Sequence, residues 1–332
     1  MQVYSKKAMF KTIFLIKSFC VFCALCCLSF DSIAAENDAE TATLKKYNSG
    51  IFINRINEFD VKTGTAEVDF WYWVVSDDKN LSLQKLELSN GKLEPIGDVI
   101  TQNKNKKYYL AHRYIAQAKC VLNLKEFPFD TQKVVLSFED GELTLDQMIF
   151  VPDKVNSGID MSFQMNEWIV KGVEYQVGDH YYPSTFGDLD IPSGQGSHYS
   201  QFKVIITLER RGSFWQKLFK YFWAVVVSVL VGLFALLIRV CDLDGRFGMV
   251  VGALFANVGC SFLLADKLPE SPVISRAEWV SYISLGFIML FIVESIISLA
   301  FYNNGYTKFS RWMDFSVFIF SMITYSGIWF FI

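Results

Sequence analysis

The chain has 332 residues, and its 31 Lys and Arg against 34 Asp and Glu leave a formal net charge of −3. This charge gives no electrostatic basis for a nucleic-acid partner, which would need a basic surface. Charged residues concentrate before residue 212 and become sparse after it, so the sequence predicts an ordinary folded domain followed by one suited to lipid.

Residues 1–35 are predicted to be a secretory signal peptide. Several lysines precede an apolar run from Phe19 to Phe30, and small residues suited to cleavage follow up to Ala35. An uncleaved membrane anchor is the alternative, although the run is short for a membrane span. The signal peptide predicts export, with the domain that follows it outside the membrane.

Cysteine usage predicts no disulfide in the mature chain. Removal of residues 1–35 leaves Cys120, Cys241 and Cys260. Cys120 falls in the first domain and the other two fall in the lipid-suited half, so an intrachain bridge is not expected even in an oxidising compartment.

Residues 36–211 are predicted to form an all-β, immunoglobulin-like sandwich. Hydrophobic side chains occupy every second position from 68 to 74 and from 202 to 208, which is the period of half-buried strands. Similar runs at 107–114, 132–138 and 168–175 are separated by clusters of Gly, Asp, Asn and Pro. This spacing is typical of an antiparallel sandwich.

Residues 212–332 are predicted to form an all-α, four-helix transmembrane bundle. Four apolar segments, each long enough or nearly long enough to cross a bilayer, lie at about 214–240, 246–266, 279–302 and 309–332. The connections between them are short, so consecutive helices should be antiparallel neighbours. Lys and Arg are too evenly spread over these connections to fix the orientation, which rests on the signal peptide.

The second apolar segment has an unusual face. Steps of four and three residues place on it Asp244, Gly248, Gly252, Phe255, Gly259, Phe262 and Asp266. Repeated around a symmetric ring of subunits, the acids would attract cations at both mouths of a pore and the phenylalanines would form hydrophobic constrictions. The face carries no basic residue, which predicts cation selectivity. On these residues alone, a helix-packing surface made by Gly248 and Gly252 is an equal alternative.

A motif in the first domain points to a family. The chain reads Phe-Pro-Phe-Asp-Thr-Gln from Phe127 to Gln132, seven residues after Cys120. This stretch resembles the signature loop of the pentameric ligand-gated ion channels, the Cys-loop receptor superfamily, in its prokaryotic branch. The resemblance continues through Pro269 and Pro272 and through the order of signal peptide, sandwich and four helices. It implies a homopentamer in the bilayer of the bacterial inner membrane that conducts monovalent cations when a small-molecule agonist, not identified by the sequence, binds.

The resemblance also implies roles in the pore. Asp244 matches the cytoplasmic selectivity ring, Phe255 and Phe262 match gate positions, and Arg246 matches a basic residue that points away from the pore. Val134 stands at the position of the second loop cysteine, so the family's loop disulfide is absent. The chain departs from the family in lacking a proline in the first helix and in the glycines of the pore face. An exported, non-conducting small-molecule receptor of the same architecture is therefore the alternative function.

In the resembled family the agonist binds between subunits, under a hairpin that here spans about 177–197. The candidate ligand-binding residues are Trp71, Trp73, Tyr181, Tyr182, Phe186 and Tyr199. Aromatic faces beside the carboxylates of Asp188 and Asp190 suit a cationic amine. The alternative, favoured for any single ring, is that it only fills the sandwich or the subunit contact.

The resemblance further implies a path that couples ligand binding to the pore. The predicted coupling residues are Phe127, Pro128, Phe129, Asp130, Gln132, Arg210, Arg211, Pro269 and Pro272. The loop around Pro128 should rest on the loop that contains the last two prolines. Asp130 should pair with Arg210 or Arg211. A surface pair of this kind contributes under about 1 kcal/mol, and partial burial at an interface would raise that contribution.

Three further residues are ionisable candidates. Glu294, in the third apolar segment, should face protein or water, as a hydrogen-bonded structural residue or, less favoured, as a proton-sensitive site. His180 and His198 flank the hairpin and suit a metal ion or a proton sensor, although solvated loop histidines are commoner. An enzyme is the rival class, but the chain has no metal-ligand spacing, nucleophile elbow or phosphate loop, so we predict no catalytic residue, metal or cofactor.

Overall fold

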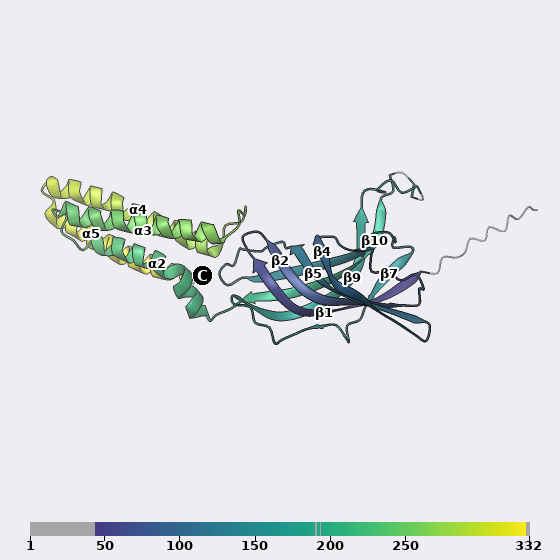
Figure 1. The fold of residues 1–332 in the computed structure, drawn as a ribbon. Helices are drawn as coiled ribbons and strands as arrows, with labels where there is room; N and C mark the ends of the chain where they lie inside the picture. The colour runs from purple at the N-terminus through teal and green to yellow at the C-terminus, as the bar shows by residue number, and fades with distance from the viewer. Residues whose placement is uncertain (1–43, 190, 193, 330–332) are drawn as a thin grey trace, which may run out of the picture. The chain divides into compact units, whose positions relative to one another are not determined.

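The computed structural model describes residues 44–189, 191–192 and 194–329, and the predicted signal peptide lies outside them (Figure 1). Strands are followed along the chain by helices. Their bounds are β1 (Lys45–Asp60), β2 (Thr65–Ser76), β3 (Leu86–Leu88), β4 (Gly91–Lys104), β5 (Lys107–Lys119), β6 (Thr131–Asp140), β7 (Met148–Pro152), β8 (Gly158–Ile159), β9 (Trp168–Tyr182), β10 (Ser197–Arg210), α2 (Phe214–Ala235), α3 (Leu243–Lys267), α4 (Arg276–Asn303) and α5 (Thr307–Ile328).

The strands form two sheets. The larger has the order β4-β5-β2-β1-β7, with the short β8 also pairing with β1, and the smaller has the order β3-β6-β10-β9. Pairing is antiparallel except that β7 and β8 run parallel to β1. The predicted all-β domain is therefore present, with two sheets in a sandwich-like arrangement.

The core of this domain comes from the period-two pattern. On β2 the side chains of Val68, Phe70, Tyr72 and Val74 are buried, and the predicted alternation on β10 is buried in the same way. Rings from the two sheets meet across the core: the Phe70 and Phe138 ring centroids lie 5.6 Å apart. The buried side of each sheet thus faces the other sheet.

Capping residues set where the helices begin. Ser213 and Ser275 each form a capping box, with Gln216 at the start of α2 and Glu278 at the start of α4. The side chain of Asp242 accepts a hydrogen bond from the Gly245 N–H, so α3 starts at Leu243, before the predicted residue 246. Helix α2 correspondingly ends at Ala235 rather than near 240, which leaves enough chain for the turn into α3.

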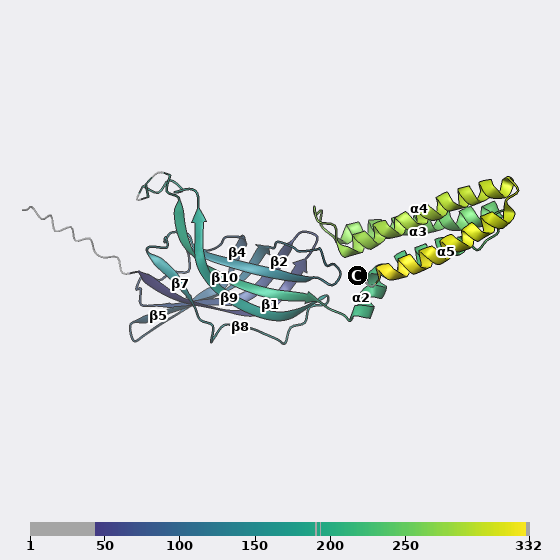
Figure 2. The same cartoon turned by 180° about the vertical axis from the view of Figure 1, so that it is seen from behind.

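Three of the helices, α2, α3 and α4, are long and apolar enough to cross a membrane. Consecutive helices pack against each other in sequence order, and α4 also packs on α2 (Figure 2). At Gly232 of α2 an added Cβ would lie 3.0 Å from the Phe291 ring of α4, so this glycine allows the two helices to approach closely. The chain is thus a membrane protein by the length and composition of these helices.

The fourth predicted span, 309–332, forms helix α5, but α5 is less apolar than the other three. Its first turns carry Lys308, Arg311 and Asp314, and serines recur along it. Its exposed face is nevertheless apolar farther on, at Phe315, Ile319 and Phe320 among others. Residues 330–332 lie outside the described part of the chain.

Candidate functional site

Helix α3 has two different faces. Its buried residues, Arg246, Val250, Ala253 and Asn257, follow helical spacing and lie toward α2 and α4. Every residue of the predicted pore face is exposed on the opposite side. The rings of Phe255 and Phe262 are the largest part of it, with exposed fractions of 72% and 73%.

The glycines of this face have no neighbour within the described chain. A Cβ added to Gly248, Gly252 or Gly259 would meet no atom within 4 Å outside its own helix. A packing surface for another helix of the same subunit would bring atoms into that range. The glycines therefore do not serve helix packing within the described part of the chain.

Arg246, on the buried face of α3, connects three helices. Its guanidinium donates to Ser295 Oγ at 2.8 Å and to Glu294, both on α4, and to the two carboxylate oxygens of Asp314 on α5 at 3.1 and 2.9 Å. Glu294 is 4% exposed and faces protein, and its Oε1 atom accepts no hydrogen bond from the described residues. Arg246 thus points away from the exposed face of α3.

Asp266, at the other end of the exposed face, has a partner in the β domain. Lys62 Nζ lies 2.7 Å from Asp266 Oδ1, and both side chains are largely exposed. The hydrogen bond to the Asp266 carboxylate raises the pKa of Lys62. Asp266 therefore pairs with the loop between β1 and β2 at the C-terminal end of α3, whereas Asp244 forms no ion pair with another described residue.

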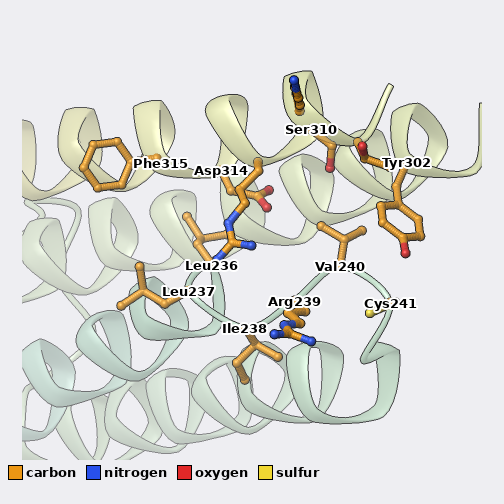
Figure 3. Close-up of a pocket in the computed structure, with 13 residues that line it drawn as sticks. Leu236, Leu237, Ile238, Arg239, Val240, Cys241, Tyr302, Ser310, Asp314 and Phe315 are labelled. Carbon is orange, nitrogen blue, oxygen red and sulfur yellow. The ribbon is translucent and has the colours of Figure 1, made fainter. Parts of the chain in front are cut away.

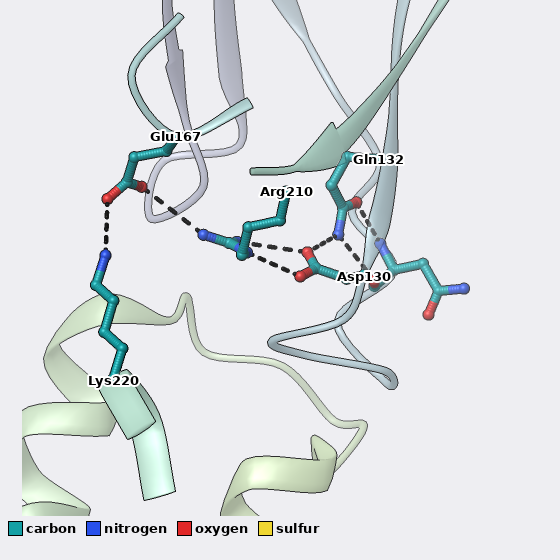
Figure 4. Close-up of polar contacts among 6 residues, drawn as sticks. Asp130, Gln132, Glu167, Arg210 and Lys220 are labelled. Atoms are coloured by element: carbon teal, nitrogen blue, oxygen red, sulfur yellow. Dashed lines mark hydrogen bonds and ion pairs between the residues drawn. The ribbon is translucent and has the colours of Figure 1, made fainter. Parts of the chain in front are cut away.

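Asp130 and Arg210 form a buried ion pair where β10 leads into α2 (Figure 4). Arg210 Nε donates to Asp130 Oδ1 at 3.0 Å, and Nη2 approaches Oδ2 at 3.4 Å. Asp130 is 1% and Arg210 6% exposed, so the pair is buried rather than on the surface, and the surface-pair value of under about 1 kcal/mol does not apply to it. The alternative partner, Arg211, is exposed.

Polar and aromatic groups enclose this pair. Gln132 Nε2 donates to Asp130 Oδ2 at 2.6 Å, and Glu167 lies 3.7 Å from Arg210 Nη1. The Arg210 guanidinium carbon lies 4.9 Å from the Phe127 ring centroid and 4.4 Å from that of Trp168. Burial between two rings strengthens a charge–ring attraction because water is excluded.

The loop between β5 and β6 contacts helices α2 and α4. The Phe127 ring packs edge-on against Tyr221 at 5.0 Å, and the Phe129 ring stacks on Phe214 at 5.1 Å. Leu124 and Phe127 also join a buried apolar cluster whose other members are Phe222, Val225, Leu268, Ala277 and Val280. The loop that carries the ion pair is thus packed on the first turns of α2. The Phe127–Pro128 peptide bond is cis.

The same loop is attached to the start of α4. The Arg276 N–H donates to the Lys125 carbonyl at 3.0 Å, and the Arg276 guanidinium pairs with Glu126 at 2.5 Å. Leu268 and Arg276 flank the predicted coupling residues Pro269 and Pro272, of which the first is half-buried and the second exposed. The contacts of the loop therefore run through the two ends of the α3–α4 connection.

The hairpin of β9 and β10 carries four of the candidate aromatics, and three of them lie together. Tyr182 lies 5.2 Å from Phe186 and 5.8 Å from Tyr199, centroid to centroid, and both pairs are edge-on. Tyr181 packs on His198 at 4.9 Å, and both remain largely exposed. Asp190 lies outside the described residues.

A buried carboxylate that sequence reasoning missed lies beside these rings. Glu139 of β6 accepts a hydrogen bond from the Tyr182 hydroxyl at 2.9 Å and contacts His180 Nδ1 and Gln201 Nε2. Burial first, and then the hydrogen bond to Glu139, raise the pKa of Tyr182 to about 12. His180 and His198 pair with carboxylates, and no group of metal-ligating side chains suited to an ion occurs in the described residues.

Trp71 and Trp73 belong to the other sheet. They alternate with the core residues of β2, so they lie on the outer side of the larger sheet, half-buried, and Trp73 Nε1 donates to Asp153 at 3.3 Å. One subunit therefore does not join them to the hairpin aromatics.

Comparison with known proteins adds no assignment, since neither a protein-family model nor a curated protein matches the chain.

Proposed function

We propose that the chain is a subunit of a homopentameric ligand-gated ion channel of the Cys-loop receptor type. In this proposal an immunoglobulin-like sandwich lies outside the bacterial inner membrane and helices α2 to α5 cross it. The exposed face of α3 carries the proposal. A lipid-facing helix side is expected to be apolar, whereas this side has an acid near each end and bare glycine backbone between them.

Exposed rings at both ends of the helices support the membrane part. Toward the β domain these are Trp215, Trp279 and Tyr282, and toward the opposite end they are Tyr302, Tyr306 and Trp312. Trp and Tyr gather at membrane–water interfaces because they have an apolar body and a polar edge. Since α5 carries rings of the second belt and an apolar face beyond them, it takes part as the fourth span.

Cation selectivity and gating are assigned to different residues of the α3 face. Asp244 carries an unpaired carboxylate among the described residues and would form a negative ring at the mouth remote from the β domain. Phe255 and Phe262 are about two turns apart, and rings of such side chains offer water no hydrogen-bond partner. A constriction of this kind closes by dewetting, so the phenylalanines are the gate in this proposal.

Coupling to the ligand is assigned to the Asp130–Arg210 pair. Arg210 ends β10, the second strand of the ligand hairpin, and Asp130 belongs to the loop packed on α2 and α4. A movement of the hairpin strand would thus be passed to the helices through a buried contact. The agonist class is a small cationic amine, because Tyr182, Phe186 and Tyr199 lie together beside the carboxylate of Glu139.

The proposal is tested by current recorded from the purified full chain in a planar bilayer. Phe255→Ala and Phe262→Ala should raise the open probability in the absence of ligand, since each removes a ring from the constriction. Phe320→Ala is the matched control, because that ring is 62% exposed on α5, away from the proposed pore. If wild type and both pore variants assemble as oligomers but carry no current, the non-conducting receptor is the better function.

A further inference from the structure

A cavity of about 530 Å3 lies where α2 leads into α3 and where α4 leads into α5 (Figure 3). Residues 236–241 of the first connection and residues of the first turns of α5 line most of it. In Figure 3 the labelled Arg239 and Val240 on the connection lie across from Ser310 on α5. Helices α2 and α3 run in opposite directions, so this is the end of the bundle remote from the Asp130–Arg210 pair.

The cavity has an excess of positive charge. Arg239, Lys308 and Arg311 line it, their side chains are exposed, and none forms an ion pair with another described residue. Asp314 also lines it, but both of its carboxylate oxygens are bound by Arg246 at 3.1 and 2.9 Å. The acid is thus already paired on α3, whereas the three basic groups have no ion-pair partner among the described residues.

The start of α5 adds to this positive potential. The residue before the helix, Tyr306, provides no side-chain hydrogen bond to the first turn. The first N–H groups of a helix have no partner within it and carry a partial positive charge. Thr307 and Lys308 of this turn line the cavity, so backbone and side-chain charges of the same sign converge there.

The remaining wall is apolar and open to the surroundings of the helices. Leu237 and Phe315 line the cavity and are 56% and 60% exposed. Tyr302, which also lines it, and the nearby Trp312 belong to the exposed aromatic belt at this end of the bundle. The basic groups therefore lie at the depth of lipid headgroups, and the apolar wall lies beside acyl chains.

We propose that this cavity binds a phosphate-bearing anion, and that its occupant is the headgroup of an anionic phospholipid. Arg239, Lys308 and Arg311 pair with the phosphate, and the acyl chains lie along Leu237 and Phe315. The apolar wall favours a lipid over a free phosphate, which would use only the basic groups. The site requires that the helices lie in a membrane, but it does not require that the chain conducts ions.

Lipid retention by the purified full-length protein tests the site. The protein is equilibrated with mixed micelles containing phosphatidylglycerol or phosphatidylcholine, and the retained lipid is counted by native mass spectrometry. We expect preferential retention of phosphatidylglycerol and a loss of about fivefold in affinity for each basic group removed, thus about 25-fold for Arg239→Gln with Arg311→Gln. Arg239→Lys with Arg311→Lys keeps the charges and should keep the preference. Lys267→Gln, at the opposite end of α3, is the matched control and should bind like wild type.

Three results would overturn the proposal. The first is equal retention of the two lipids by wild type. The second is unchanged phosphatidylglycerol binding in the Gln double variant, and the third is an equal loss in the Lys267→Gln control. Inorganic phosphate at millimolar concentration distinguishes the source of the anion: it should not displace the lipid, and displacement would assign the cavity to a soluble phosphate compound and refute the lipid.

Discussion

Asp130→Asn is expected to destabilise the β domain, because it removes one partner of a buried ion pair. The substitution keeps the size of the side chain and retains an oxygen that can accept from Gln132 or Arg210. It removes the charge that neutralises Arg210, which is only 6% exposed and cannot turn to solvent without leaving the Phe127 and Trp168 rings. The cost therefore comes mainly from an unpaired buried guanidinium.

The size of the effect follows from the remaining contacts. Removing one partner of a buried pair costs about 3–5 kcal/mol. Arg210 keeps a second carboxylate, Glu167, at 3.7 Å, and both ring contacts, so the lower end, about 3 kcal/mol, is expected. For a domain of 150–250 residues each kcal/mol shifts the melting temperature by about 2–4 °C, which gives a fall of about 6–12 °C.

The assay is thermal unfolding of the full chain in detergent, followed by the β-sheet signal in circular dichroism. Glu167→Gln is the control, because its carboxylate is more than half exposed and pairs with Arg210 and Lys220 only at 3.7 and 3.5 Å. An exposed pair of this kind contributes under about 1 kcal/mol. If Asp130→Asn melts no earlier than Glu167→Gln, the buried pair does not stabilise the domain and the argument fails.

Further predictions concern pH, thiols and selectivity. The hydrogen-bonded Arg113 guanidinium lowers the pKa of Asp69 in the folded protein. The ionised Asp69 therefore contributes its full stabilisation at pH values above the ordinary carboxylate pKa, and this stabilisation is lost as the pH falls through the lowered pKa. Asp69→Asn should therefore unfold earlier than wild type in urea at neutral pH, and the gap should close in acid; a constant gap would contradict the pairing. Thiol labelling should modify the exposed Cys241 before Cys120, whose pKa is raised by burial, and all three mature cysteines should react after denaturation. Reversal potentials should show cation preference, reduced more by Asp244→Ala than by Asp266→Ala, because Lys62 already offsets Asp266; a chloride-selective current would exclude the assignment.

The strands and helices could be predicted because their signals are local. The alternation of apolar and polar residues along β2 and β10 involves only neighbouring positions in the sequence. It matches the buried positions from Val68 to Val74 and from Phe202 to Leu208. The start of α3 was missed by three residues because the cap is a single acid, Asp242, with no strong sequence pattern around it. The local pattern thus predicts the helices and strands, whereas single side chains determine where these elements begin and end.

Partners distant in sequence could not be predicted in the same way. Glu167 and Trp168 enclose Arg210, and Lys62 pairs with Asp266, although the residues are separated by long stretches of chain. Nothing in the sequence around Glu139 distinguishes it from a solvated strand residue, yet three side chains of the hairpin strands bond to it. Only the pairing of β6 with β10 and β9 brings these groups together.

Asp314 bears on the proposal that α5 is a fourth membrane span. An isolated acid counts against a span, because moving it into lipid is costly. In the structure its two oxygens are bound by Arg246, which belongs to α3 and is fully buried. The acid is thus paired in a protein-enclosed site, where Arg246 also bonds Glu294, and neither Asp314 nor Arg246 lies on the exposed face of its helix. A bilayer would meet only the exposed side chains of α5, which include the apolar Phe315 and Phe320, and the proposed fourth span rests on this exposed face rather than on the mean composition of the helix.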